Sequence, residues 1–181
     1  MKKGILLFLL AIAMLFSGCA SEKKQAAENV PERSSESMRD YTGEDYLKKF
    51  TDFFNGAECA PYTAELALKE ADDPGYRIIR HNDKKTVIAS FQNDGIIMTT
   101  TQGILKEENE LCCNIFAAAM TAFSSSKYSF EDSLQEVRQA LSALSGDNTK
   151  TVFRDYARFE FTAKAGAGSG DSFVFFIVGP N

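Results

Sequence analysis

The sequence predicts an α+β domain with one antiparallel sheet of about five strands and helices packed on one face of the sheet. Two periodic patterns lead to this prediction. Apolar residues recur at helical spacing in three segments, and five others show apolar and polar alternation or short apolar runs. The elements follow the order α-βββ-αα-ββ, and consecutive strands joined by short connections are expected to pair antiparallel.

The first part of the domain is predicted to be a helix followed by a three-stranded meander. Apolar residues over 44–54 recur at helical spacing, with charged residues on the other face. Residues 64–71 are expected to add a short helical turn before Asp-Pro-Gly at 73–75 breaks the chain. Three β-like runs follow, over 76–81, 86–92 and 95–101. Asp94 and Gly95 between the last two runs are a strong hairpin signal.

Two helices are predicted in the middle of the chain. Residues 106–124 carry one apolar stripe, and acidic residues in the first turns suit the positive end of the helix dipole. Ser129, with Asp132 three residues later, has the pattern of a helix N-cap and opens a second helix that ends at Gly146. Both stripes are typical of helices that pack on a sheet.

Two strands are predicted to close the sheet as a hairpin. Residues 149–164 alternate cleanly and predict one long strand with Arg154, Tyr156 and Arg158 on an exposed face. Residues 172–178 predict a final strand that is almost wholly apolar. Arg and Tyr side by side are enriched at binding interfaces, so these three side chains are candidates for partner binding. The alternative is an ordinary solvent face with cross-strand charge pairs.

The N-terminus has the pattern of an export signal. Lys2 and Lys3 form a positive region, and an apolar run from Ile5 to Phe16 follows. A membrane-spanning helix needs about 20 apolar residues, so a retained transmembrane anchor fits this run poorly. The tetrapeptide Phe16-Ser17-Gly18-Cys19 at its end resembles the lipobox of bacterial lipoproteins, with Phe16 where that family usually has Leu.

The lipoprotein resemblance implies the organisation of the whole chain. It implies a signal peptide over 1–18, which is removed, and a Cys19 thiol that carries a lipid with acyl chains such as palmitate. The protein is then expected to be lipid-anchored on the extracytoplasmic side of the cell membrane or the outer membrane, a choice that the sequence leaves open. Polar residues over 19–43 predict a disordered tether, and 44–181 a single domain.

The charge of the chain bears on its partners. It has 20 Lys and Arg residues against 25 Asp and Glu, a formal net charge of −5. Nucleic-acid binding requires clustered basic residues that displace counterions, so this acidic balance argues against nucleic acid as a partner. We therefore expect a protein, a peptide or another envelope component.

Candidate chemical groups are few. Beyond Cys19, the cysteines are Cys59, Cys112 and Cys113. Outside the cytosol, a disulfide between Cys59 and either helix cysteine is one expectation, and three small buried thiols are the other. The single histidine, His81, excludes most zinc sites built from several histidines, and the acidic clusters lack the ligand spacing of a calcium loop. We expect no metal and no cofactor.

Three functions remain open from the sequence, and the least specific of them is a purely structural lipoprotein role. The first is a non-catalytic binding or accessory module that holds a protein, peptide or envelope component. The alternative is a small envelope enzyme with Cys113 as nucleophile and His81 as base. The glycine-rich run over 166–170 lacks the Lys and the following helix of a phosphate-binding loop, so it is expected to be a hairpin tip.

Overall fold

The structure is a computed structural model of the chain, and it describes residues 38–100, 106–144, 148–165 and 172–181. The predicted signal peptide, Cys19 and most of the predicted tether lie outside these ranges, as does the glycine-rich run. No helix within the described ranges is both long and apolar enough to cross a membrane.

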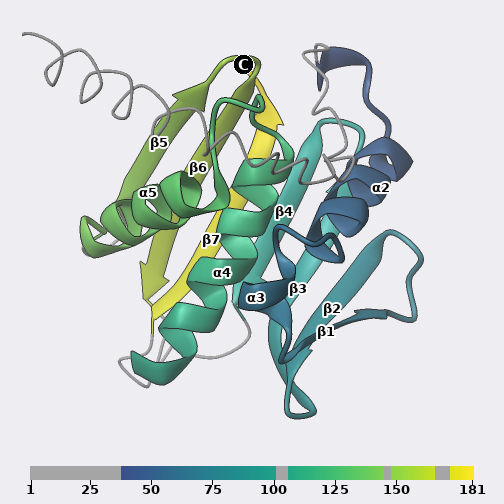
Figure 1. Cartoon of the computed structure of the whole chain (residues 1–181), viewed down its shortest axis with the longest axis vertical. Helices are drawn as coiled ribbons and strands as arrows, with labels where there is room; N and C mark the ends of the chain where they lie inside the picture. Colours follow the sequence, from purple (N-terminus) through teal and green to yellow (C-terminus); the bar gives the residue numbers. More distant parts are fainter. Residues whose placement is uncertain (1–37, 101–105, 145–147, 166–171) are drawn as a thin grey trace, which may run out of the picture. The chain divides into compact units, whose positions relative to one another are not determined.

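Within the described residues, seven strands form one antiparallel sheet in the order β1-β2-β3-β4-β7-β6-β5 (Figure 1). The strands are β1 (Leu66–Glu70), β2 (Tyr76–His81), β3 (Lys84–Gln92), β4 (Gly95–Thr100), β5 (Thr149–Arg154), β6 (Ala157–Ala165) and β7 (Ser172–Pro180). A four-stranded meander, β1 to β4, is joined to a three-stranded one, β5 to β7, by the central pair β4 and β7. The α+β class and the antiparallel sheet are therefore as predicted, but the number and order of the strands are not.

The helices lie on one face of this sheet, as Figure 1 shows for α2, α4 and α5. The helical elements are η1 (Met38–Asp40), α2 (Gly43–Phe54), α3 (Ala60–Thr63), α4 (Lys106–Ala122) and α5 (Phe130–Ser142). Thr42 and Ser129 cap the starts of α2 and α5, and at each cap the side chain and an Asp three residues later bond reciprocally. The predicted start at Ser129 is thus confirmed.

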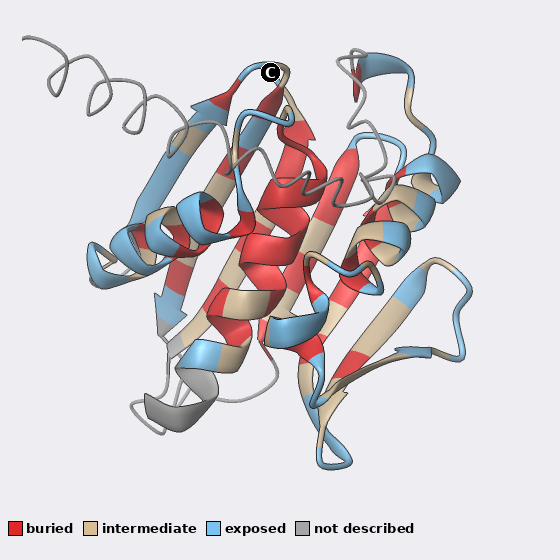
Figure 2. Ribbon diagram, in the orientation of Figure 1, coloured by how far each residue is buried: buried red, intermediate tan, exposed pale blue. Residues whose placement is uncertain are grey.

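The core lies between the sheet and α4. Figure 2 shows α4 buried along most of its described length, whereas α2 and α5 bury only one side. Phe116 on α4 stacks on Phe176 of β7 with ring centroids 4.9 Å apart, and Phe161 of β6 lies 4.7 Å from the same ring. Each fully buried Phe contributes about 1.5–3 kcal/mol through removal from water, so these rings hold α4 against the sheet centre.

The strand β1 was not predicted. Its sequence, Leu-Ala-Leu-Lys-Glu, consists of residues that favour helix, and it was expected to add a helical turn. In the structure it pairs with β2 from Leu66 opposite His81 to Glu70 opposite Arg77. Local propensity is a weak prior, and here the tertiary pairing overrides it.

The prediction of one long strand over 149–164 is wrong, because the chain reverses at Asp155 and Tyr156 to give β5 and β6. A two-residue turn leaves the alternation of the sequence unbroken, and neither turn residue is Gly. Asp155 takes a positive φ of 49°. Contacts from elsewhere hold the turn, since Lys127 Nζ lies 2.5 Å from Asp155 Oδ1 and Asn181 donates to the Asp155 carbonyl.

The folded domain includes residues that were assigned to the tether. Met38 is 1% exposed, and its carbonyl accepts a hydrogen bond of 3.3 Å from the Tyr46 hydroxyl. The described packing therefore starts at residue 38 rather than at 44.

Candidate functional site

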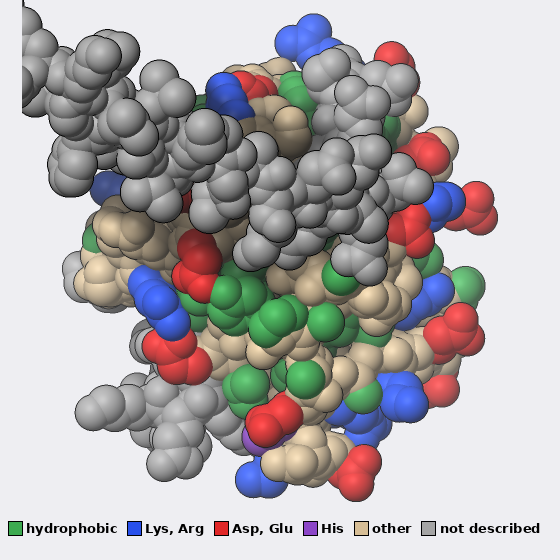
Figure 3. Space-filling view, viewed as in Figure 1, with side chains coloured by type: hydrophobic (Ala, Val, Ile, Leu, Met, Phe, Trp, Pro, Cys, Tyr) green, Lys and Arg blue, Asp and Glu red, His purple; other side chains and the backbone are tan. Residues whose placement is uncertain are grey.

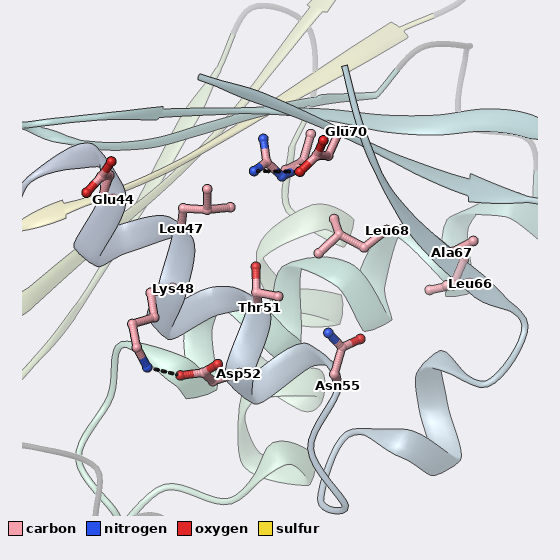
Figure 4. Close-up of a pocket in the computed structure, with 11 residues that line it drawn as sticks. Glu44, Leu47, Lys48, Thr51, Asp52, Asn55, Leu66, Ala67, Leu68 and Glu70 are labelled. Carbon is pink, nitrogen blue, oxygen red and sulfur yellow. Dashed lines mark hydrogen bonds and ion pairs between the residues drawn. The ribbon is translucent and has the colours of Figure 1, made fainter. Parts of the chain in front are cut away.

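A groove of about 590 Å³ runs between α2 and the hairpin of β1 and β2 (Figure 4). One wall comes from α2 and includes Leu47 and Thr51. The other comes from β1 and includes Leu66 and Leu68. A second hollow, of about 450 Å³, shares Leu47 and continues along α2 towards Thr42. We call the first of these hollows the α2–β1 groove.

The groove follows from how α2 packs on a twisted sheet. The helix buries Tyr46, Phe50 and Phe54, and its main strand contacts are with β3 and β4. Neighbouring strands in a sheet are rotated by about 20–25°, so a straight helix seated on β3 and β4 diverges from β1, two strands farther out. This divergence leaves a wedge-shaped space between α2 and β1, and the outward side of α2 faces that space.

The walls of the groove are apolar where helix and strand face each other. Leu47, Leu66 and Leu68 are all half-buried and pack against the margin of the hydrophobic core. In Figure 4, Leu47 and Thr51 of α2 and Leu68 of β1 lie in the gap between the two elements. An extended apolar side chain placed here would contact both walls.

The groove is lined by three carboxylates, of Glu44, Asp52 and Glu70, and by two cations, Lys48 and Arg77, and Lys48 is paired with Asp52 at 2.6 Å. The Arg77 Nη1 atom donates to the carbonyls of Pro74 and Tyr76 at 2.9 and 2.8 Å. Its Nη2 atom is 3.7 Å from Glu70, whose side chain is 85% exposed. Glu44 has no ion pair or hydrogen bond within the described residues. Because Arg77 is committed largely to backbone carbonyls, both carboxylates are open to a further cation.

The outer edge of β1 adds hydrogen-bonding groups. Among the residues that the structure describes, this strand ends the sheet order and pairs only with β2. In such an edge strand, alternate backbone N–H and C=O groups have no strand partner. The α2–β1 groove therefore combines apolar walls, a rim with one more carboxylate than cation, and backbone groups able to pair with an extended chain.

The structure does not bring the three predicted partner-binding residues together. Arg154 ends β5 on the helix-covered side and is 3% exposed. Its Nε and Nη2 atoms donate to Glu136 Oε2 at 2.9 and 2.5 Å, and Nη1 donates to Ser133 Oγ at 2.8 Å. The guanidinium also lies 4.2 Å from the centre of the Tyr128 ring. The expectation that Arg154 is exposed is wrong, because β5 and β6 are separate strands.

The other two residues of that set lie elsewhere. Tyr156 is half-buried in the turn, whereas Arg158 is exposed on β6 and lies 3.2 Å from Glu160. The register pairs Arg154 with Ala157, so Arg158, one residue on, faces the opposite side of the sheet. A role of any of them in partner binding stays a prediction.

Cys59, Cys112 and Cys113 are all buried, and the structure holds them as thiols. Burial raises the pKa of the Cys59 thiol to about 12 and that of Cys113 to about 11. Such thiols are almost wholly protonated at neutral pH, whereas a nucleophile requires the thiolate. A disulfide among these cysteines stays a prediction for the oxidised chain.

His81 and Cys113 do not form the pair that a thiol enzyme requires. The His81 ring lies at the end of β2, with Nε2 3.3 Å from Glu65 and 3.2 Å from Asn82. Cys113 is on α4, where the charges of Glu110 and Arg138 act on it. In the part of the chain that the structure describes, no group of three or more His, Cys, Asp or Glu side chains is arranged to hold a metal ion.

Charged side chains of both signs are scattered over the helix side of the molecule, and hydrophobic ones gather near its middle (Figure 3). Comparison of the chain with protein-family models, curated proteins and solved structures found no match. Sequence reasoning missed the α2–β1 groove, because β1 was not predicted and no motif marks Leu47 or Leu68. The one sequence feature that could have indicated the groove is that the outward side of α2 carries an apolar residue, Leu47, among polar ones.

Proposed function

We propose that the protein is a lipid-anchored binding module of the cell envelope, without catalytic activity of its own. Cys19 is the anchor, on the extracytoplasmic side of the cell membrane or the outer membrane. The domain holds an extended segment of a partner protein or a peptide in the α2–β1 groove. The resemblance of Phe16-Ser17-Gly18-Cys19 to the lipobox supports the anchor.

The observation that carries the binding proposal is the position of an apolar groove beside an unpaired strand edge. A bound segment that adds to β1 gains backbone hydrogen bonds, and its alternate side chains enter the groove. Leu47, Leu66 and Leu68 offer these side chains an apolar surface that is only half-buried in the free protein. Affinity then comes from the backbone pairing and specificity from the groove.

The rim charges define the preferred segment further. Glu44 and the exposed Glu70 flank the groove, so Lys or Arg at positions that point outward from the segment would meet opposite charge. The favoured partner is therefore an extended segment in which apolar and basic residues alternate. An acidic segment of the same apolar content is disfavoured by like charge.

A direct test is the binding of two labelled heptapeptides that differ only in charge. One alternates Leu with Lys and the other alternates Leu with Glu, and fluorescence anisotropy measures their affinity for the protein. We expect the Leu-Lys peptide to bind at least tenfold more tightly. Leu68→Arg, which fills the groove with a cation, should abolish this binding.

The matched control is Leu144→Arg, which alters a half-buried leucine after α5, away from the groove. This variant adds the same charge as Leu68→Arg but leaves the groove intact, so its affinity for the Leu-Lys peptide should stay within about twofold of that of the unsubstituted protein. Equal losses in the two variants would show that overall charge, and not the groove, attracts the peptide, and would refute the proposed site.

A further inference from the structure

The face of the sheet opposite the helices, the open face, is unusually apolar at its centre. β7 alternates between Val174, Phe176 and Val178, which are buried under the helices, and Phe173, Phe175 and Ile177, which face the other way and are half-buried. A strand that is apolar on both sides is typical of a sheet covered on both faces. Within the described residues, helices cover only one face of this sheet (Figure 1).

The strand register arranges the open face in rows that cross the strands. The central row runs across all seven strands, as the cross-strand partners show: Lys69, Ile78, Ile88, Thr99, Phe175, Thr162 and Thr149. On one side of this row lie Ile97, Ile177 and Glu160, which are partners in turn. On the other side, Phe173 lies opposite Lys164.

Two opposite charges near the centre of the open face are placed symmetrically about the central row. Glu160 and Lys164 both lie on β6, two residues before and two residues after Thr162. Lys164 sits 5.7 Å from the centre of the Phe175 ring and has no ion pair within the described residues. Glu160 is paired with Arg158, whose side chain is 44% exposed.

We propose that the open face binds the open face of a second copy of this chain, with the two-fold axis lying along the central row. A rotation about this axis reverses the strand direction in the second copy. Ile177 then faces Phe173 of the other copy, and Glu160 faces Lys164, so the central apolar groups meet each other and Glu160 meets a base. Lys69, at the exposed β1 end of the row, meets its own counterpart where water screens the two charges. A two-fold axis parallel to β7 would instead set β6 over β4 and leave Glu160 against Ile97, so the crosswise axis is the complementary one.

The size of the open face suits such a contact. Seven strands about 4.8 Å apart and about six residues of roughly 3.3 Å each give a face of roughly 650 Å². A standard stable interface buries about 800 Å² per partner, so one such contact gives a modest dimer. Two sheets stacked in this way lie about 10 Å apart with strands nearly aligned. The α2–β1 groove is on the helix side and stays open, so this proposal is independent of the proposed function.

Cysteine crosslinking of the full chain in its membrane tests the arrangement. Thr162 lies on the axis, so Thr162→Cys should crosslink to its counterpart with a short bismaleimide. Cys59, Cys112 and Cys113 are buried, so the unsubstituted chain measures the background level of crosslinking. Gln139→Cys, exposed on the outer side of α5, is the control for random collisions. We expect a crosslinked dimer at least tenfold more abundant for Thr162→Cys than for Gln139→Cys.

Charge reversal in the Thr162→Cys chain tests the register. Glu160→Lys or Lys164→Glu alone places like charges opposite each other, and each should reduce the crosslinked dimer roughly tenfold. The double reversal restores opposite charges across the axis and should recover the crosslink. Equal crosslinking of Thr162→Cys and Gln139→Cys, or a double reversal no better than the single ones, would overturn the proposal.

Discussion

The ion pair of Arg154 and Glu136 leads to an asymmetric prediction about stability. Arg154 is 3% exposed, whereas the Glu136 side chain is 36% exposed, so the two partners differ in how well water can replace the missing one. Glu136→Ala leaves the buried guanidinium of Arg154 without its carboxylate partner. Arg154→Met leaves a carboxylate that water can reach, and it keeps an apolar stem in the buried space.

The magnitudes follow from what each variant leaves unpaired. Removing one partner of a buried pair costs about 3–5 kcal/mol when the remaining charge is uncompensated, and Glu136→Ala falls at the lower end because Ser124 and Ser133 still accept from Arg154. Arg154→Met loses the guanidinium above Tyr128, worth about 0.5–2 kcal/mol. Both serines keep backbone acceptors in that variant, so we expect a loss of about 1–2 kcal/mol.

Urea denaturation followed by circular dichroism measures these differences. We expect Glu136→Ala to cost about 1–2 kcal/mol more than Arg154→Met, and the double variant to be no less stable than Glu136→Ala. Lys48→Met, in an ion pair whose side chains are 77% and 59% exposed, is the control and should cost under about 0.5 kcal/mol. A larger loss for Arg154→Met, or losses that add in the double variant, would refute the reasoning.

Three further predictions concern other parts of the chain. Gly95→Ala should lower the free energy of unfolding, measured by urea denaturation, by more than about 3 kcal/mol, because φ is +147° and the new Cβ would lie 2.0 Å from the Val178 carbonyl oxygen. Gly75→Ala is the control and should have little effect, because its new Cβ would have its nearest contact at 3.5 Å. Burial raises the pKa of the Cys113 thiol from 9.0 to about 11, so its stabilising contribution is full below pH 9 and is lost as the pH rises towards 11. The free energy of unfolding, measured as a function of pH, should fall over this range, and the fall should be smaller in Cys113→Ala. Cys19→Ser should abolish metabolic labelling with palmitate and leave the precursor uncleaved, and unchanged labelling would remove the anchor from the proposal.

The parts of the fold that the sequence predicts well are those with local causes. Ser129 and Asp132 bond to each other at the start of α5, and Asn93 and Asp94 form the turn before Gly95 begins β4, so each signal is contained in a few residues. The turn at Asp155 is different. It depends on Lys127, which is 28 residues away in the chain, and no residue near it marks a reversal.

The α2–β1 groove escapes sequence reasoning for a related reason. It arises from the divergence of α2 from β1, and β1 exists only because β2 pairs with it. The environment of Arg154 likewise follows from the reversal that places β5 under α5. Periodicity identifies which face of an element is apolar, but it does not report the angle between elements or the strand that ends a sheet.

Amide hydrogen exchange of β1 tests the central claim most directly. The outward N–H groups of Leu66–Glu70 have no strand partner within the described ranges, so they should exchange quickly in the free protein. On addition of the Leu-Lys heptapeptide, we predict that exchange slows in this strand and in the facing part of α2, and stays unchanged in α5. Peptide binding without any slowing in Leu66–Glu70 would contradict the account.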